Sequence, residues 1–332
     1  MLKLPWVMKM RFFDAHSDIW YNVGMRMEKG ETNVLENCHL PQLKEGKVIG
    51  VNAALWTKPD SKNPSERFIK LLGARSKELT KIGKESEDFV IVTKSEDIQK
   101  AVERGKIFLI SSVEGLIGIG KNLNFLYTLY ELGFRVVSLT WNEENDLAAG
   151  CGTKDENKGL TNLGKQAVKI IEELGMVLDV SHLNEKSFWD VAKISEKPFI
   201  ATHSNCYSLC ETPRNLKDEQ IKEIAKRGGI IGISALPRIV DRENPTVEKF
   251  VEHIKYAANF VGVDHVGLGL DFSDYLEEFL NKQSHEKMST KDLEDATKLP
   301  QIIPLLEKAG FTKKEIDRIC FLNFVEFFKA VL

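Results

Sequence analysis

The feature that most constrains the fold of this chain is a repeated alternation between short apolar runs and longer amphipathic stretches. The short runs are rich in β-branched residues and are bounded by Gly, Asn or Asp, a pattern typical of buried parallel strands. We predict eight such strands, at Arg11–Asp18, Val48–Trp56, Ile107–Glu114, Phe134–Trp141, Met176–His182, Phe199–Asn205, Ile230–Leu236 and His265–Phe272.

The stretches between these runs carry apolar residues at three- and four-residue spacings, which predicts helices. They span Glu66–Ile82, Asn122–Leu132, Asn162–Leu174, Lys217–Lys226 and Val247–Phe260. Near the end of the chain, Thr312 and Glu315 have the spacing of a capping box that opens the last helix. Eight strand–helix units predict an α/β fold of the closed (β/α)8 type, the TIM barrel.

A doubly wound open sheet is the alternative architecture. It is less favoured because no glycine-rich phosphate loop follows the first strand, and the spacing of Gly115, Gly118 and Gly120 does not match the dinucleotide-binding fingerprint. No Pro/Gly/Ser-rich linker divides the 332 residues, so we predict a single barrel domain over residues 1–332. The stretch 57–106 is long for one crossover and predicts a helical insertion.

Composition narrows the range of partners. The net charge of −3 and the dispersed Lys and Arg argue against a nucleic-acid-binding surface. The apolar stretches fall short of the roughly 20 residues of a membrane helix, and the first residues lack the pattern of a signal peptide. Five cysteines, an odd number, suggest free thiols in a reducing compartment. We therefore expect a cytoplasmic protein that binds neither nucleic acid nor membrane, and a homodimer remains open.

Ligand-type side chains occur where the predicted strands end, which is where the active site of such a barrel lies. His16 and Asp18 are two residues apart and should share one face of their strand. Glu114 is a carboxylate at the end of an apolar strand, which is costly to bury unpaired. His182 and His203 end neighbouring strands about 4.8 Å apart and could share one ion.

Each of these residues alone has a structural explanation, such as a salt bridge or a helix cap. Together they predict a site for zinc or a similar divalent ion, since imidazole and carboxylate are suitable ligands. Glu114 could bridge two ions. Asp271 ends the eighth strand, and Trp56, at the end of the second, is predicted to form a wall of the pocket.

These residues lie in a series of short motifs that runs along nearly the whole chain: Phe13–Asp18, Leu40–Gly46, Val113–Gly115, Gly159–Gly164, Leu178–His182, Thr202–Asn205, Pro213–Leu216 and Gly267–Phe272. The motifs and their order resemble those of the membrane dipeptidase (renal dipeptidase) family of the amidohydrolase superfamily. The resemblance implies a hydrolase with two zinc ions that cleaves dipeptides, including those with a C-terminal D-residue.

The resemblance also implies roles for individual residues. One ion would lie on His16 and Asp18, the second on His182 and His203, with Glu114 bridging both. Arg214 would bind the terminal carboxylate of the substrate, a task that its planar fork suits. Asp271 would contact the substrate amine and assist proton transfer to the leaving nitrogen, so Glu114 and Asp271 are the predicted catalytic residues.

The sequence departs from the family at Trp141, where many animal members have a histidine that helps to stabilise the oxyanion. Trp141 is therefore either a wall that sets specificity or an indole N–H donor. Two other functions remain in competition: a barrel hydrolase that acts on another small amide or a lactone, and a non-catalytic metal-binding barrel. The second would predict damaged ligands, whereas all five are intact.

Overall fold

Parallel strands form the centre of the molecule. The computed structural model describes residues 10–82, 86–279 and 289–332. Strands pair in the order β1-β2-β4-β5-β6, with β3 beside β4, and β7 pairs with β8. Their bounds are β1 Phe12–Ser17, β2 Val48–Trp56, β3 Phe89–Val92, β4 Ile107–Glu114, β5 Phe134–Ser138, β6 Val177–Asp179, β7 Ile231–Ile233 and β8 Val266–Leu268.

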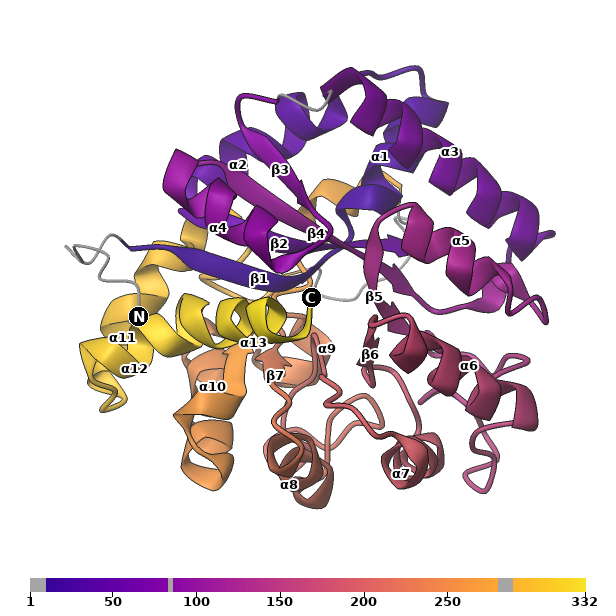
Figure 1. Cartoon of the computed structure of the whole chain (residues 1–332). Coiled ribbons are helices and arrows are strands. Elements are labelled where there is room, and N and C mark those ends of the chain that lie inside the picture. Colours follow the sequence, from indigo (N-terminus) through magenta and orange to yellow (C-terminus); the bar gives the residue numbers. More distant parts are fainter. Residues whose placement is uncertain (1–9, 83–85, 280–288) are drawn as a thin grey trace.

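Helices surround these strands, and successive helices follow one another around the outside (Figure 1). Within the described part of the chain, every helix is too short or too polar for a membrane span. The α-helices are α1 Ile19–Glu28, α2 Leu40–Glu45, α3 Pro64–Ile82, α4 Ser95–Arg104, α5 Phe125–Glu131, α6 Asn162–Glu173, α7 Glu185–Ile194, α8 Asp218–Lys226, α9 Pro237–Val240, α10 Val247–Val261, α11 Ile302–Lys308, α12 Lys313–Asp317 and α13 Asn323–Val331.

The predicted eight-stranded barrel is formed only in part. The parallel strands curl into a half-barrel, and the predicted sixth strand contributes only isolated bridges, from Ile200 to Asp179 and from Ala201 to Ile231. Between β8 and β1 the described residues make no ladder. The closed ladder that the strand–helix rhythm predicts is therefore not complete.

Aspartate side chains explain why the pairing is interrupted at these two places. Oδ1 of Asp179 accepts the backbone N–H of Thr202 at 3.0 Å, and Oδ1 of Asp14 accepts that of Leu270 at 2.7 Å. Each of these N–H groups is therefore satisfied by a carboxylate instead of the carbonyl of a neighbouring strand. The strand segments stay adjacent, but their pairing is partly carried by side chains.

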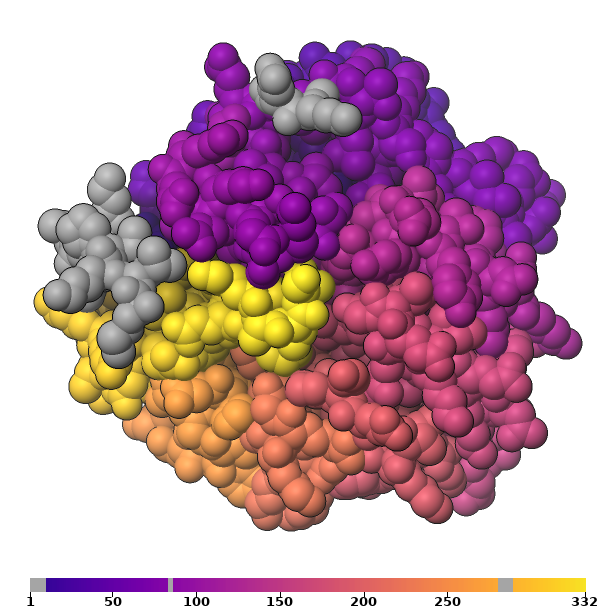
Figure 2. Space-filling view, viewed as in Figure 1, coloured from indigo at the N-terminus to yellow at the C-terminus, as the bar shows by residue number. Residues whose placement is uncertain are grey.

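The last helix, α13, covers the amino-terminal ends of the strands. Phe13 at the start of β1 lies 5.7 Å from the ring of Phe108 and 5.6 and 5.7 Å from the rings of Phe324 and Phe328 in α13. In the space-filling view, α13 fills the middle of this face (Figure 2). Because this aromatic cluster occupies one end of the strands, a site must form at the opposite, carboxyl end.

The segment predicted as a helical insertion, 57–106, contains more than helices. It holds α3 and α4 and, between them, β3, which pairs with Ile107–Ile110 of β4, while β5 pairs with Ser111–Val113 farther along β4. This short strand was not predicted, because four residues give too little alternation to be distinguished from a loop. The predicted capping box of Thr312 and Glu315 is present, but it opens the short helix α12 and not the last helix, α13.

Candidate metal centre

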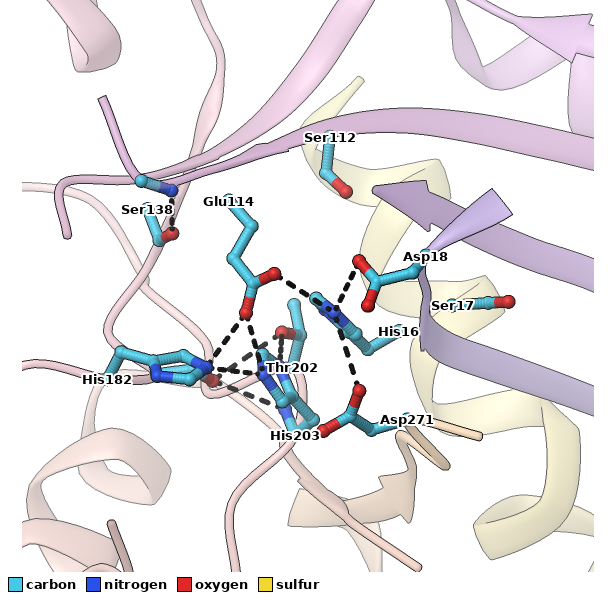
Figure 3. A network of polar contacts seen from close by, with 12 residues as sticks. His16, Ser17, Asp18, Ser112, Glu114, Ser138, His182, Thr202, His203 and Asp271 are labelled. Atoms are coloured by element: carbon cyan, nitrogen blue, oxygen red, sulfur yellow. Dashed lines mark hydrogen bonds and ion pairs between the residues drawn. The ribbon is translucent and has the colours of Figure 1, made fainter. Parts of the chain in front are cut away.

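Side chains from several strand ends converge on Glu114 (Figure 3). Its Oε1 lies 2.8 Å from Nε2 of His182 and 3.3 Å from Nε2 of His203. Its Oε2 lies 3.7 Å from Nε2 of His16, and the same nitrogen lies 3.9 Å from Oδ1 of Asp18. The structure thus brings together all five residues that the sequence predicts as metal ligands, with Glu114 in a position to reach both groups.

Glu114, His16 and Asp18 reach the site from different kinds of backbone. Glu114 is the last residue of β4 and shares the face of Phe108 and Ile110, so simple alternation turns it inward. His16 lies near the end of β1, where the pairing with β2 becomes irregular. Asp18 lies beyond the strand, as the N-cap of α1, so it approaches His16 through the turn into the helix and not through strand alternation.

The two remaining histidines meet at their Nε2 atoms, which are 2.9 Å apart. His203 lies in the segment that bridges β6 and β7, and its ring stacks on that of His16 with 3.6 Å between centroids. His182 follows β6 and has a φ of 69°, in the left-handed region. Such a backbone costs about 1–3 kcal/mol and persists only where its surroundings hold it.

Buried polar atoms without a partner show that a cation fits this cluster. Nε2 of His16 and Oδ1 of Asp18 are buried and accept or donate no hydrogen bond within the described structure. Two overlapping sets of ligand atoms lie within 4.8 Å of one another, one formed by His16, Glu114 and His203 and the other by His16, Asp18 and Asp271. A divalent ion would satisfy these atoms, and the nitrogen and oxygen donors suit zinc.

The charges of the cluster favour the same conclusion. Burial lowers the pKa of His16 to about 3, and it lowers the pKa values of His182 and His203 well below the usual range, so all three rings are neutral and able to bind metal. Burial, with the neighbouring carboxylates, raises the pKa values of Glu114 and Asp18. The described residues thus place too little positive charge beside these buried carboxylates to keep them ionised, and divalent ions would supply that charge.

A chain of hydrogen bonds behind His203 determines which of its nitrogens faces Glu114. The hydroxyl of Thr202 donates to Oδ2 of Asp179 at 2.6 Å, and its oxygen lies 2.7 Å from Nδ1 of His203. Because Thr202 has a single hydroxyl proton, Nδ1 of His203 must donate, which leaves the lone pair on Nε2. Asp179 belongs to the motif Leu178–His182, but its role could not be inferred from spacing alone.

Arg214 is a buried guanidinium beside this cluster. Its Nη1 donates to Oγ of Ser204 at 2.7 Å and its Nη2 donates to the carbonyl oxygen of His203 at 2.5 Å. Its Nε is buried without a partner, and no carboxylate of residues 10–82, 86–279 or 289–332 forms an ion pair with it. Burial lowers the pKa of Arg214. The arginine is therefore held in place with unused donors, as an anion site requires.

Asp271 lies beside His16 and Asp18 in the cluster. Its φ of 54° is left-handed, and its backbone N–H donates to the carbonyl oxygen of His16 at 3.1 Å, across the gap between β8 and β1. Oδ1 of Asp271 is 4.0 Å from Nε2 of His16. Burial raises the pKa of Asp271 to about 6, opposed by Arg214 and Arg238. The structure thus places Asp271 next to the candidate ligands.

Aromatic rings stand next to the histidines. Trp56 ends β2 directly opposite Glu114 in the β2–β4 register, and its ring centroid lies 5.0 Å from that of Trp141 and 4.9 Å from that of Tyr21. Trp141 also lies 6.0 Å from the ring of His182. Both tryptophans are only partly buried, so they form an aromatic side of the site. Tyr21, which the sequence analysis did not single out, belongs to the same side.

Comparisons with known proteins give matches over most of the chain. A family model described as membrane dipeptidase (peptidase family M19) matches residues 5–332. An uncharacterized protein in the pqqA 5' region of Klebsiella pneumoniae is 32% identical over 245 residues, covering 71% of this chain and 86% of that protein. Dipeptidase tcpJ of Claviceps purpurea is 30% identical over 242 residues, covering 72% of this chain and 54% of tcpJ.

A solved structure has the same fold. It is a metallo peptidase from Rhodobacter sphaeroides in complex with a phosphinate mimic of the dipeptide L-Ala-D-Ala. The two superpose with a TM-score of 0.84 over 97% of this chain and 99% of that one, at 22% sequence identity. At 22% sequence identity, this similarity shows a shared fold and nothing further.

Proposed function

This chain belongs to the membrane dipeptidase family, peptidase family M19, whose members are metal-dependent hydrolases of peptide bonds, and from that premise we propose that it cleaves dipeptides with the help of two zinc ions. The observation that carries the proposal is the position of Glu114 between His16 and the pair His182 and His203. A pair of bridged ions needs one carboxylate with an oxygen near each ion, and the two oxygens of Glu114 lie near His16 on one side and near His182 and His203 on the other.

The assignment of ligands follows from these contacts. His16 and Asp18 would hold one ion, His182 and His203 the other, and Glu114 both. Ions bound there would polarise the scissile carbonyl and lower the pKa of a water molecule. The architecture we propose is the (β/α)8 barrel, of which the parallel strands form half, with these residues at or just past the carboxyl ends of the strand segments.

Substrate binding would depend on Arg214 and Asp271. The buried, unpaired guanidinium of Arg214 suits the free carboxylate of a peptide C-terminus, and the carboxylate of Asp271 suits its free amine. A site that binds both charged ends accepts two residues and excludes longer chains. The bound L-Ala-D-Ala mimic of the Rhodobacter sphaeroides peptidase supports a D-residue at the second position here as well.

The alternative function is hydrolysis of another small amide or a lactone by the same centre. Such substrates lack one or both charged ends, so they would leave Arg214 buried without an anion, which is costly. We therefore favour dipeptides.

We expect the protein, reconstituted with zinc, to hold roughly two ions per chain and to hydrolyse dipeptides but not tripeptides. Elemental analysis gives the stoichiometry, and a library of L,L- and L,D-dipeptides with matched tripeptides and lactones gives the specificity. Fewer than about one ion per chain, or faster hydrolysis of a lactone than of any dipeptide, would contradict the proposal.

A substitution at Trp141 shows whether its indole N–H replaces the histidine that donates to the oxyanion in many animal members of the family. We propose that Trp141 is a wall of the pocket, because two bound ions would already supply charge to stabilise the oxyanion and because the ring packs against Trp56. Trp141→Phe, which keeps the bulk and removes the N–H, should then lower kcat by less than about tenfold, whereas loss of an oxyanion donor costs about 10²–10³. A hundredfold fall in kcat at unchanged metal content would show that the indole N–H is the donor.

A further inference from the structure

The ring of His182 is held by a residue that no ligand assignment includes. Its Nδ1 lies 2.7 Å from Oδ1 of Asn142, and the thiol of Cys151 donates to the same oxygen at 2.9 Å. We propose that Asn142, with Cys151 behind it, is a positioning residue that keeps the proton of His182 on Nδ1 and turns the Nε2 lone pair toward Glu114. This inference rests on the metal site proposed above.

The chemistry of the amide supports this orientation. A histidine that binds a metal through Nε2 must carry its proton on Nδ1, and this N–H needs an acceptor. Asn142 presents its carbonyl oxygen there, and that oxygen has two lone pairs, which match the two donors His182 and Cys151. His203 has the corresponding support from Thr202, so both histidines have an acceptor at Nδ1.

The loop of residues 142–152, which carries Asn142, also holds the backbone of His182. The backbone N–H of Cys151 donates to the carbonyl oxygen of His182 at 2.7 Å, and Gly150 forms a bridge with Leu183. These contacts hold the left-handed backbone of His182. One loop therefore determines the position of the residue, the rotation of its ring and the site of its proton.

The loop is rigid enough for this task because it is folded on itself. The N–H of Gly150 donates to the carbonyl oxygen of Glu143 at 2.9 Å, and that of Gly152 donates to the carbonyl oxygen of Asn142 at 2.8 Å. A Cβ at position 150 would lie 2.3 Å from the carbonyl oxygen of Trp141, so only glycine fits this close approach. The backbone of Asn142 is therefore held by hydrogen bonds within its own loop, independently of the contact between its side chain and His182.

The experiment measures metal affinity of the metal-free protein by titration with Co²⁺, whose visible absorption reports the geometry of the site. Asn142→Ala should weaken one of two binding steps by about 10–100-fold, the usual effect of losing the acceptor behind a metal-bound histidine. Asn142→Asp, which keeps an oxygen at this place, should restore the affinity of that step. Cys151→Ala, which leaves the contact between Asn142 and His182, should have the smaller effect.

Asn145→Ala is the matched control, because Asn145 stabilises the same loop through the carbonyl oxygen of Leu139 and the N–H groups of Leu147 and Ala148 without contacting His182. If Asn145→Ala weakened Co²⁺ binding as much as Asn142→Ala, or if Asn142→Ala bound both ions normally, the positioning role would be refuted. Absence of Co²⁺ binding by the unaltered protein would instead refute the proposed metal site, so the two failures are distinct.

Discussion

Glu114→Gln is expected to lower kcat by roughly 10²–10³-fold or more and to weaken the binding of both metal ions. Glu114 lies within 2.8–3.7 Å of three histidine nitrogens, so one substitution affects both halves of the site. Removing one partner from a buried set of charges costs about 3–5 kcal/mol, and each 1.36 kcal/mol is tenfold in rate. Steady-state kinetics together with elemental analysis measure both effects.

Glu78→Gln provides the control for this substitution. Glu78 is a fully buried glutamate in α3, where its Oε1 accepts the backbone N–H of Leu35 at 2.9 Å, outside the cluster. It should reproduce any general cost of replacing a buried carboxylate while leaving metal content unchanged. A Glu114→Gln protein with near-normal turnover and two bound ions would mean that Glu114 does not bridge.

Arg214→Ala is expected to lower kcat/KM for dipeptides with a free carboxylate by roughly 30- to 5,000-fold. Loss of a buried charged partner of the substrate costs about 2–5 kcal/mol. Hydrolysis of the matching dipeptide amide should change little, because the amide never formed the charged pair. The quantity to measure is the ratio of kcat/KM for the acid to that for the amide, which should fall toward one.

Two further variants identify the cause of such a loss. Arg214→Lys keeps the charge but not the planar fork, and should recover only part of the ratio. Arg135 is as buried as Arg214, at 8% exposure, but its guanidinium donates to backbone carbonyls, including that of Thr93, outside the site. Arg135→Ala should leave the acid-to-amide ratio unchanged. Equal cleavage of acid and amide by the unaltered protein would refute the role of Arg214.

Much of the fold could be predicted because its elements are encoded locally. Val48–Trp56 and Ile107–Glu114 were predicted with the bounds that the structure shows, since each is a mostly apolar run that begins directly after a lysine. The strand Phe199–Asn205 was overestimated, because Asp179 takes up the N–H of Thr202 and leaves only isolated bridges. A side chain that replaces a ladder carbonyl leaves no trace in hydrophobic periodicity.

The amino-acid sequence alone shows which chemical groups the site contains: three imidazoles and several carboxylates at or just past the predicted strand ends, and one arginine in the segment after the predicted sixth strand, in an order that identifies the family. The tertiary structure alone decided how they face one another. Asn142 meets His182 across 40 residues, and His182 adopts a left-handed backbone that only its neighbours can hold. The physical reason is that strand position is a local property of apolar spacing, whereas the direction of a lone pair depends on hydrogen bonds between segments far apart in the chain.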